Sequence, residues 1–309
     1  MRELRERLAA APISWGVCEV PGWGRTLPPE RVLAEMQQLG FRATEQGPVG
    51  YLPDDPAEAR ELLARYDLRV IGGFLPVVLH DPAEAAATEE LAVATARRFQ
   101  QLGAEVIVAA VVVDQGWSPR IPLDTDAWKH VFTMFDRLDG IAAAHDLIHV
   151  VHPHVGTLVE SAEDVRHVLD NSPVHWCLDT GHLMLGGTDP VAFAAEAFDR
   201  VRHVHLKDVR SDVAEQLLSG ELTLTTASQH GLFCPVGQGD VPVADTVVAL
   251  ERSGYNRWYV LEQDTALTTE PPQGSGPVVD VAASVDYLIT VVAAQQGEAC
   301  TSDESASSA

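Results

Sequence analysis

The sequence predicts a single-domain α/β protein of the (β/α)₈-barrel, or TIM-barrel, class. Short segments rich in β-branched residues alternate with longer, amphipathic segments rich in Ala and Leu, which is typical of repeated βα units and a parallel sheet. Eight strand segments can be counted, and a length of 309 residues suits one barrel. An open doubly wound sheet is the alternative, but no convincing Gly-x-Gly-x-x-Gly motif follows the first predicted strand.

The predicted strands are short, and several are apolar almost throughout, as expected for strands that are covered on both faces. Their ranges are Ala11–Trp15, Arg42–Gln46, Arg69–Phe74, Val106–Val112, Ile148–His152, His175–Leu178, His203–Leu206 and Trp258–Glu262. Eight strands with eight helices close a barrel more naturally than they form an open sheet.

Proline and acidic residues mark the starts of the predicted helices. Pro28-Pro29-Glu30 begins the first helix, and Gly40 ends it. Asp55-Pro56, Asp81-Pro82 and Asp189-Pro190 each combine an N-cap residue with a proline that suits the first turn. Ser161-Ala162-Glu163-Asp164 has a capping pattern of its own.

Two segments interrupt the βα rhythm. The segment Lys207–Asp240 is too long for an ordinary βα loop, so we predict a lid or active-site loop after the seventh strand. The tail Gly297–Ala309 is rich in Ser, Ala and acidic residues, so we predict that it is disordered. The barrel domain is therefore expected to span residues 1–296.

The chain is strongly acidic, with 21 Lys and Arg against 45 Asp and Glu and a formal net charge of −24. Such a surface repels nucleic acid and anionic lipid, and it disfavours a phosphorylated substrate. We therefore expect a small molecule, a polyhydroxylated carbonyl compound, as the partner, with no nucleic acid and no membrane. Assembly into a homo-oligomer stays open.

The same sequence carries no signal for export. No apolar stretch reaches the roughly 18 residues of a membrane span, and no cleavable signal peptide follows the charged N-terminus. The four cysteines have no short pair spacing, which argues against a disulfide framework and a thiolate zinc site. A reducing cytoplasm is the expected location.

Histidines are concentrated in one part of the chain: nine of the twelve fall between His145 and His205. Several of them, with Asp and Glu, stand where an apolar strand segment stops. Because catalytic residues of a barrel lie at the carboxyl ends of its strands, strands five to eight should bring these side chains to one rim.

Four of these residues are the predicted metal ligands. Asp179, His205 and Glu262 each follow apolar residues, where an unpartnered polar group is costly to bury. His152 ends strand five and is preferred to His154 as the fourth ligand. Imidazole and carboxylate together suit a borderline divalent ion such as Mn²⁺, Co²⁺, Fe²⁺ or Zn²⁺.

Other side chains near this rim are candidates for proton transfer or substrate binding. His182 follows Asp179 by three residues and could be a ligand, a substrate contact or a structural cap. Lys207 lies two residues after His205, and a salt bridge, for example to Asp208, is an equal alternative to a catalytic role. His203 is expected to point away from the site.

Three residues of the first two strand regions complete the predicted site. Glu45 ends strand two and could bind hydroxyl groups or act as an acid or base. Trp15 and Trp23 could form apolar walls against the C–H faces of a sugar, although barrel packing explains tryptophans there equally well.

At these residues the chain resembles the xylose-isomerase-like barrel superfamily of sugar isomerases, epimerases and dehydratases, and within it most of all the inosose (2-keto-myo-inositol) dehydratase branch. The resemblance covers about residues 11–292. The segments that carry it are Ala11–Gly16, Val20–Gly24, Glu45–Pro53, His152–Thr157, Leu178–His182, His203–Asp208 and Phe233–Gly239.

The resemblance implies one bound Mn²⁺ or Co²⁺ and a Glu, Asp, His, Glu ligand pattern on strands five to eight. Asp179, His205 and Glu262 match the last three, whereas strand five offers His152 in place of Glu. In the isomerases that Glu is also implicated in proton transfer. The histidine therefore weighs against a symmetric two-Glu epimerase and favours a lyase.

The implied reaction is dehydration of a cyclic keto-polyol, 2-keto-myo-inositol (scyllo-inosose), to a dione through a metal-stabilised enolate. Glu262 or His154 would remove the proton beside the carbonyl, and Lys207, His182 or Glu45 would protonate the departing hydroxyl. Alternatives are a sugar isomerase or 3-epimerase, a C-glycoside-cleaving lyase subunit that needs a second chain, and a barrel that only binds. The net charge disfavours an endonuclease.

Overall fold

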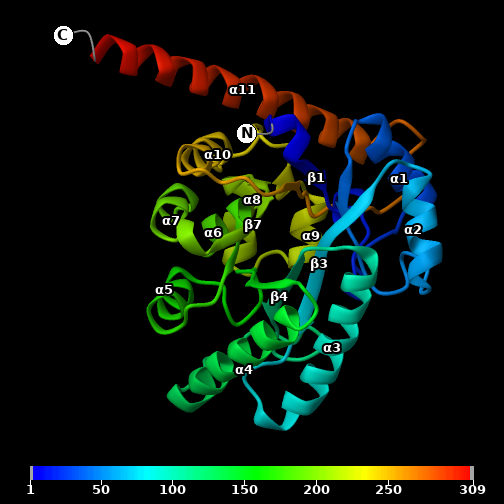
Figure 1. Ribbon diagram of the computed structural model, residues 1–309, viewed down its shortest axis with the longest axis vertical. Helices are drawn as coiled ribbons and strands as arrows, with labels where there is room; N and C mark the ends of the chain where they lie inside the picture. Colours follow the sequence, from blue (N-terminus) through cyan, green and yellow to red (C-terminus); the bar gives the residue numbers. More distant parts are fainter. Residues whose placement is uncertain (1–2, 307–309) are drawn as a thin grey trace.

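A closed barrel of eight parallel strands forms the centre of the molecule, as predicted (Figure 1). The computed structural model describes the backbone of residues 3–306 and the side chains of residues 3–292 and 294. The strands follow one another around the barrel in the order β1-β10-β7-β6-β5-β4-β3-β2. They are β1 Leu8–Ala10, β2 Ala43–Glu45, β3 Arg69–Val77, β4 Val106–Val111, β5 Ile148–Val151, β6 Trp176–Asp179, β7 Val201–Leu206 and β10 Tyr259–Leu261.

Helices surround this barrel on the outside (Figure 1). They are α1 Pro29–Gln38, α2 Pro56–Ala64, α3 Ala85–Leu102, α4 Thr125–Ala143, α5 Ala162–Asn171, α6 Thr180–Leu185, α7 Pro190–Glu196, α10 Val243–Arg252 and α11 Pro277–Ala306. Short 3₁₀ helices in the described residues are η1 Leu4–Arg7, η2 Pro12–Trp15, η3 Pro82–Glu84 and η4 Phe198–Arg200.

The helix starts follow the capping residues of the sequence. Asp55 accepts hydrogen bonds from the N–H groups of Ala57 and Glu58, at 2.7 and 3.0 Å. Ser161 and Asp164 form the reciprocal capping box at the start of α5. These bonds satisfy N–H groups that the first turn of a helix leaves free, and they fix where each helix begins.

The first strand lies upstream of its predicted position. Leu8–Ala10 pairs with β10 and β2, whereas Pro12–Trp15 forms the 3₁₀ helix η2. Pro12 has no N–H to continue a strand ladder, and Gly16, at φ +79°, ends the turn. The predicted strand Ala11–Trp15 is therefore wrong, while the other seven strands overlap their predicted ranges.

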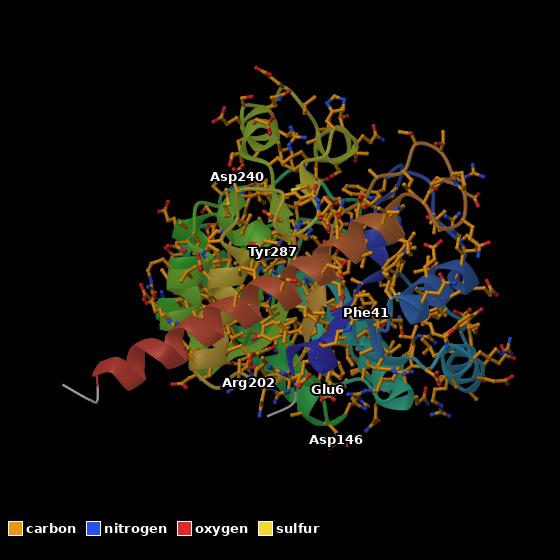
Figure 2. The ribbon with its side chains drawn as sticks, turned by 90° about the horizontal axis from the view of Figure 1, so that it is seen from above. Glu6, Phe41, Asp146, Arg202, Asp240 and Tyr287 are labelled. Atoms are coloured by element: carbon orange, nitrogen blue, oxygen red, sulfur yellow. The ribbon has the colours of Figure 1, made fainter. Side chains whose placement is uncertain are left out.

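The long segment after β7 is an ordered insertion. It contains β8 Asp208–Val209, α8 Ser211–Leu218, α9 Leu224–Gln229 and β9 Phe233–Cys234, and α8 and α9 project from the barrel (Figure 2). The buried carboxylate of Asp208 holds its two ends together. It accepts hydrogen bonds from four backbone N–H groups, those of Val209 (2.9 Å), Gly237 (2.8 Å), Gly239 (3.0 Å) and Val241 (3.0 Å).

Helix α11 runs across the body of the molecule, with Tyr287 on it (Figure 2). The hydroxyl of Ser284 on α11 accepts a hydrogen bond of 2.9 Å from the N–H of Val236, which ties the helix to the insertion. The helix continues to Ala306, into the segment predicted to be disordered, and residues 307–309 lie outside the described part. The end of the barrel domain at residue 296 stays a prediction. Among residues 3–306, no helix combines the length and apolarity that crossing a membrane requires.

Candidate metal centre

The four predicted ligands converge at the carboxyl ends of four neighbouring strands. His152 follows β5, Asp179 ends β6, His205 lies on β7 and Glu262 follows β10. Each offers one ligand atom, and the four atoms lie within 4.8 Å of one another. The strand register contributes directly, because it pairs Asp179 with His205. The structure thus assembles the predicted set, whereas the binding of a metal stays a prediction.

The distances within this group leave little room for anything but a small cation. His205 Nδ1 lies 2.9 Å from Glu262 Oε2 and 3.6 Å from Asp179 Oδ2. His152 Nε2 lies 3.3 Å from Asp179 Oδ2. Three of the four side chains are almost completely buried, and Glu262 is largely so.

Two of these atoms fit the requirements of a metal ligand. Neither His205 Nδ1 nor Glu262 Oε2 makes a well-aligned hydrogen bond among the described residues, although the two buried atoms lie 2.9 Å apart and Glu262 Oε2 lies 3.0 Å from Lys207 Nζ. A buried polar atom without a well-aligned partner is costly, and a shared cation would satisfy both. Two nitrogen and two oxygen ligands suit a borderline divalent ion better than Mg²⁺, which prefers oxygen and water.

Glu45 supports the centre from the opposite side of the barrel interior. Its Oε1 accepts hydrogen bonds from His205 Nε2 at 2.9 Å and from His203 Nε2 at 2.7 Å. When His205 carries a single proton, the bond to Glu45 holds that proton on Nε2 and leaves the lone pair on Nδ1, which faces the other ligands. The prediction that His203 points away is wrong, because residues two apart on a strand share a face.

Electrostatics hold Glu45 in its ionised form. Burial alone would raise the pKa of this carboxyl, but the nearby charge of His205 and the hydrogen bonds from His203 and His205 hold it well below its usual value. Glu45 is therefore a carboxylate fixed on two imidazoles. Its proposed roles as an acid or a hydroxyl-binding group have to compete with these bonds.

Lys207 places a buried ammonium beside the four ligands. Its Nζ lies 2.8 Å from Asp264 Oδ1, 3.0 Å from Glu262 Oε2, 3.4 Å from Asp179 Oδ2 and 2.9 Å from His182 Nε2. Asp208, the expected salt-bridge partner, holds backbone N–H groups instead. The ammonium lies among His182, Asp264 and Glu262, so a second cation there is disfavoured.

The charges in this cluster shift several pKa values. Burial opposes ionisation of Asp179, but Lys207 and His182 hold the pKa of its carboxyl well below the usual value. Burial likewise opposes the ionisation of Glu262, but His205 and Lys207 lower its pKa to about 2. Burial opposes the charging of His205, yet the neighbouring Cys177, Glu262 and Glu45 raise the imidazole pKa well above its usual value. These surroundings favour positive charge at the position between the ligands.

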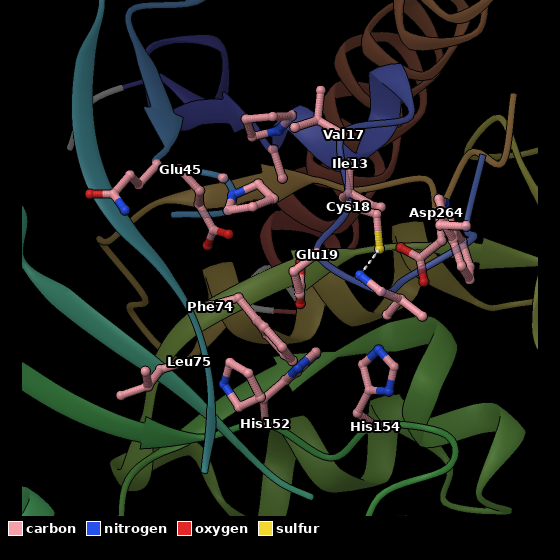
Figure 3. Close-up of a pocket in the computed structure, with 18 of the residues that line it drawn as sticks. Ile13, Val17, Cys18, Glu19, Glu45, Phe74, Leu75, His152, His154 and Asp264 are labelled. Carbon is pink, nitrogen blue, oxygen red and sulfur yellow. Dashed lines mark hydrogen bonds between the residues drawn. The ribbon is translucent and has the colours of Figure 1, made fainter. Parts of the chain in front are cut away.

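A cavity of about 910 Å³ opens above these residues (Figure 3). Glu45, His152, Lys207 and Glu262 form part of its lining, as does His154. His154 Nδ1 donates to the carbonyl of Val155 at 2.7 Å, so its Nε2 carries a lone pair. Burial, followed by the nearby charges of His152 and Lys207, lowers the pKa of His154 to about 3, which keeps the ring neutral.

The predicted tryptophan walls are only partly where they were expected. Trp15 is fully buried, its Nε1 donates to Glu35 Oε2 at 2.8 Å, and it does not line the cavity, so its predicted substrate contact is wrong. The 3₁₀ turn that replaces the predicted strand turns this ring into the core. Trp23 does line the cavity, while its Nε1 donates to the carbonyl of Thr265 at 2.9 Å.

An aromatic wall formed by Phe74 and Trp117 lines the cavity instead. The two rings are stacked, with centroids 6.1 Å apart and planes at 12°. Trp117 has a φ of 58°, an uncommon value for a bulky residue. Asp114 supports this turn by accepting hydrogen bonds from the N–H groups of Gly116 and Ser118. Strained backbone of this kind is common at ligand sites.

Sequence reasoning missed Phe74, Trp117, Asp264 and Glu19 as lining residues of this cavity. For Asp264 a signal existed, since it stands two residues after Glu262 and so shares its strand-end direction. Burial raises the pKa of Asp264 to about 7, although Lys207 opposes the shift. The other three lie on a strand interior or in loops, where no pattern in one sequence marks them.

Comparison with known proteins agrees with this architecture. Residues 33–284 match the family described as "Xylose isomerase-like TIM barrel". The chain is 32% identical to an inosose dehydratase of Geobacillus kaustophilus, over 84% of this chain and 89% of that protein. It is 29% identical to an inosose dehydratase of Lacticaseibacillus casei, over 85% of this chain and 90% of that protein.

Among solved structures, the IOLI protein crystallised with a zinc atom has a TM-score of 0.69 at 14% identity. The match covers 93% of this chain and 98% of that one, and at this identity it shows the fold alone. The chain therefore belongs to the xylose isomerase-like TIM barrel family, in which it stands among the inosose dehydratase-like enzymes.

Proposed function

We propose that this chain is a metal-dependent hydro-lyase that removes water from a cyclic keto-polyol, 2-keto-myo-inositol (scyllo-inosose), to give a trihydroxycyclohexane-dione. The observation that carries the proposal is the convergence of two imidazoles and two carboxylates at neighbouring strand ends. They lie beside a cavity large enough for a six-membered ring. The similarity to inosose dehydratases over most of the chain supports the choice of substrate.

The metal in this proposal is Mn²⁺ or Co²⁺, with Zn²⁺ and Fe²⁺ as chemically similar alternatives. His152, Asp179, His205 and Glu262 would hold it. When bound, it would polarise the substrate carbonyl as a Lewis acid and so make the neighbouring C–H group more acidic.

His154 is the base in this proposal. The hydrogen bond from its Nδ1 to the Val155 carbonyl fixes the tautomer that leaves Nε2 free to accept a proton. Its position in the cavity wall lets it approach the carbon beside the carbonyl. Glu262, the other candidate base, is committed to the ligand group and to its ion pair with Lys207.

Lys207 supplies fixed positive charge for the oxygen that becomes negative during this step. The ammonium lies in the cavity lining, and three carboxylates hold it in place before any substrate arrives. A preorganised charge of this kind stabilises an enolate without reorganisation. The wall of Phe74 and Trp117 would pack against the C–H face of the ring.

The test incubates the protein with scyllo-inosose after loading with Mn²⁺ or Co²⁺. We expect a product lighter by one water, with the ultraviolet absorbance of a conjugated dione, and no product after treatment with a chelator. Turnover of ketohexoses without dehydration of scyllo-inosose would contradict the proposal and favour an epimerase or isomerase. A protein that binds no Mn²⁺, Co²⁺ or Zn²⁺ would contradict it as well.

A further inference from the structure

The proposed elimination needs an acid that protonates the departing hydroxyl, and the three predicted candidates are engaged elsewhere. Glu45 accepts hydrogen bonds from His203 and His205. The Lys207 ammonium lies among three carboxylates, and it also contacts His182 Nε2 at 2.9 Å. In each group, the atom that would protonate the substrate hydroxyl already contacts another side chain of the protein.

Glu19 also has a carboxyl group in the cavity, and this group is not held by contacts of that kind. It lies in the loop between η2 and α1 and lines the cavity. Figure 3 shows its side chain directed into the cavity, toward the side of Phe74 and His152. Among the described residues no cation pairs with it, and its carboxyl contacts its own backbone N–H.

The loop that carries Glu19 is fixed on both sides. On one side, Gly16 at φ +79° begins the loop, and a Cβ there would lie 2.9 Å from the carbonyl oxygen of Arg25. On the other, Trp23 Nε1 donates to the Thr265 carbonyl at 2.9 Å, and the N–H of Arg25 donates to the Leu267 carbonyl at 2.8 Å. Because both ends are held, the direction of Glu19 follows from the fold.

The surroundings of Glu19 shift the pKa of its carboxyl upward. Burial raises the pKa of this carboxyl, and the negative charges of Glu262 and Glu45 raise it further. The neighbouring thiol of Cys18 also lines the cavity. Burial raises the pKa of that thiol far above its ordinary value, so it stays protonated and is a poor proton donor.

We propose that Glu19 is the general acid of the dehydration, an assignment that rests on the proposed function. The Glu19 proton passes to the oxygen of the departing hydroxyl as the C–O bond breaks. The electron pair of the enolate forms the new C=C bond, water leaves, and Glu19 becomes a carboxylate. Although neighbouring groups crowd the Glu19 carboxyl and displace water from it, part of the residue stays exposed to solvent, so the carboxylate recovers its proton from solvent.

The test separates removal of the C–H proton from loss of water, using the metal-loaded protein and scyllo-inosose in D₂O. In the variant Glu19→Gln we expect dehydration to fall about 100-fold or more, because a positioned acid contributes on this scale. Deuterium should still enter the remaining substrate beside the carbonyl, since His154 is untouched. Glu19→Asp should restore part of the dehydration.

The matched control is Glu215→Gln, an exposed glutamate on α8 outside the cavity, which should behave as the wild type. Unchanged dehydration by Glu19→Gln, or loss of deuterium exchange in step with dehydration, would overturn the assignment. A wild-type protein that neither exchanges nor dehydrates scyllo-inosose would overturn the proposed function, and the assignment with it. Melting temperature and metal content of both variants should equal those of the wild type.

Discussion

The two sides of the cavity are built in different ways. On one side, β5, β6, β7 and β10 present imidazoles and carboxylates from strand ends, in positions that the barrel register sets. On the other, β3 and two loops present Phe74, Trp117 and Glu19. The side built from the strand ends, here called the rigid half, suits a metal, which tolerates little displacement of its ligands. The side built from β3 and the loops, here called the loop half, suits orientation of the substrate.

Substitution of a strand-end ligand should have the largest effect. Asp179→Asn keeps the size of the side chain and the oxygen that caps α6 through the N–H of His182. It removes the negative charge that faces Lys207 and the other ligands. We expect turnover to fall at least about 100-fold, since even outer-shell partners of a metal site cost 10–100-fold.

The measurement pairs initial rates with the metal content of dialysed protein. We expect metal in the wild type and none in Asp179→Asn. Added Mn²⁺ at about 100 times its dissociation constant should stabilise the wild type by about 2.7 kcal/mol and leave the variant unchanged. A variant that keeps its metal and its rate would show that the rigid half is not a metal centre.

A smaller effect should follow when the support behind a ligand is removed. Glu45→Gln takes away the carboxylate that fixes the tautomer of His205. We expect the affinity for Mn²⁺ to fall about 10–100-fold, measured by calorimetric titration of metal-free protein. His203→Phe, which removes the second donor to Glu45, should weaken binding less than Glu45→Gln. Unchanged affinity in Glu45→Gln would mean that the Glu45 carboxylate does not support His205.

The loop half should respond with the smallest change, and chiefly in KM. Trp117→Ala removes one ring of the aromatic wall, and aromatic contacts contribute about 0.5–1.5 kcal/mol. We therefore expect KM for scyllo-inosose to rise about 2- to 12-fold with little change in kcat. A loss confined to kcat would contradict a binding role for the wall.

Two other tryptophans are controls for that experiment. Trp128 stacks on Phe132 at α4, outside the cavity, so Trp128→Ala should leave KM unchanged. Trp15→Phe should lower the melting temperature, because it leaves the buried Glu35 carboxylate without its indole donor, and should also leave KM unchanged.

The sequence predicted the rigid half better than the loop half for a physical reason. A buried strand that ends in His, Asp or Glu is visible in one sequence, because an unpartnered polar group there would be too costly. Asp179, His205 and Glu262 carry that signal, and the register of the parallel strands brings their strand ends side by side. Even so, the partner of His203 was not predictable, because β2 and β7 meet only through the barrel interior.

The loop half gives no comparable signal. Trp15 and Trp117 are both tryptophans near predicted strand ends, yet one enters the core and the other lines the cavity. Their directions depend on a 3₁₀ turn at Pro12 and on a left-handed backbone conformation supported by Asp114. Turn conformations of this kind depend on tertiary contacts, which a single sequence does not display.

The most direct test of the account is anomalous diffraction at the manganese edge from crystals grown with Mn²⁺. We predict one strong peak within about 2.0–2.3 Å of ligand atoms from His152, Asp179, His205 and Glu262. A peak among His154, His182 and Asp264 instead, where Lys207 now lies, would contradict the assignment of the metal centre. So would crystals that show no peak at either position.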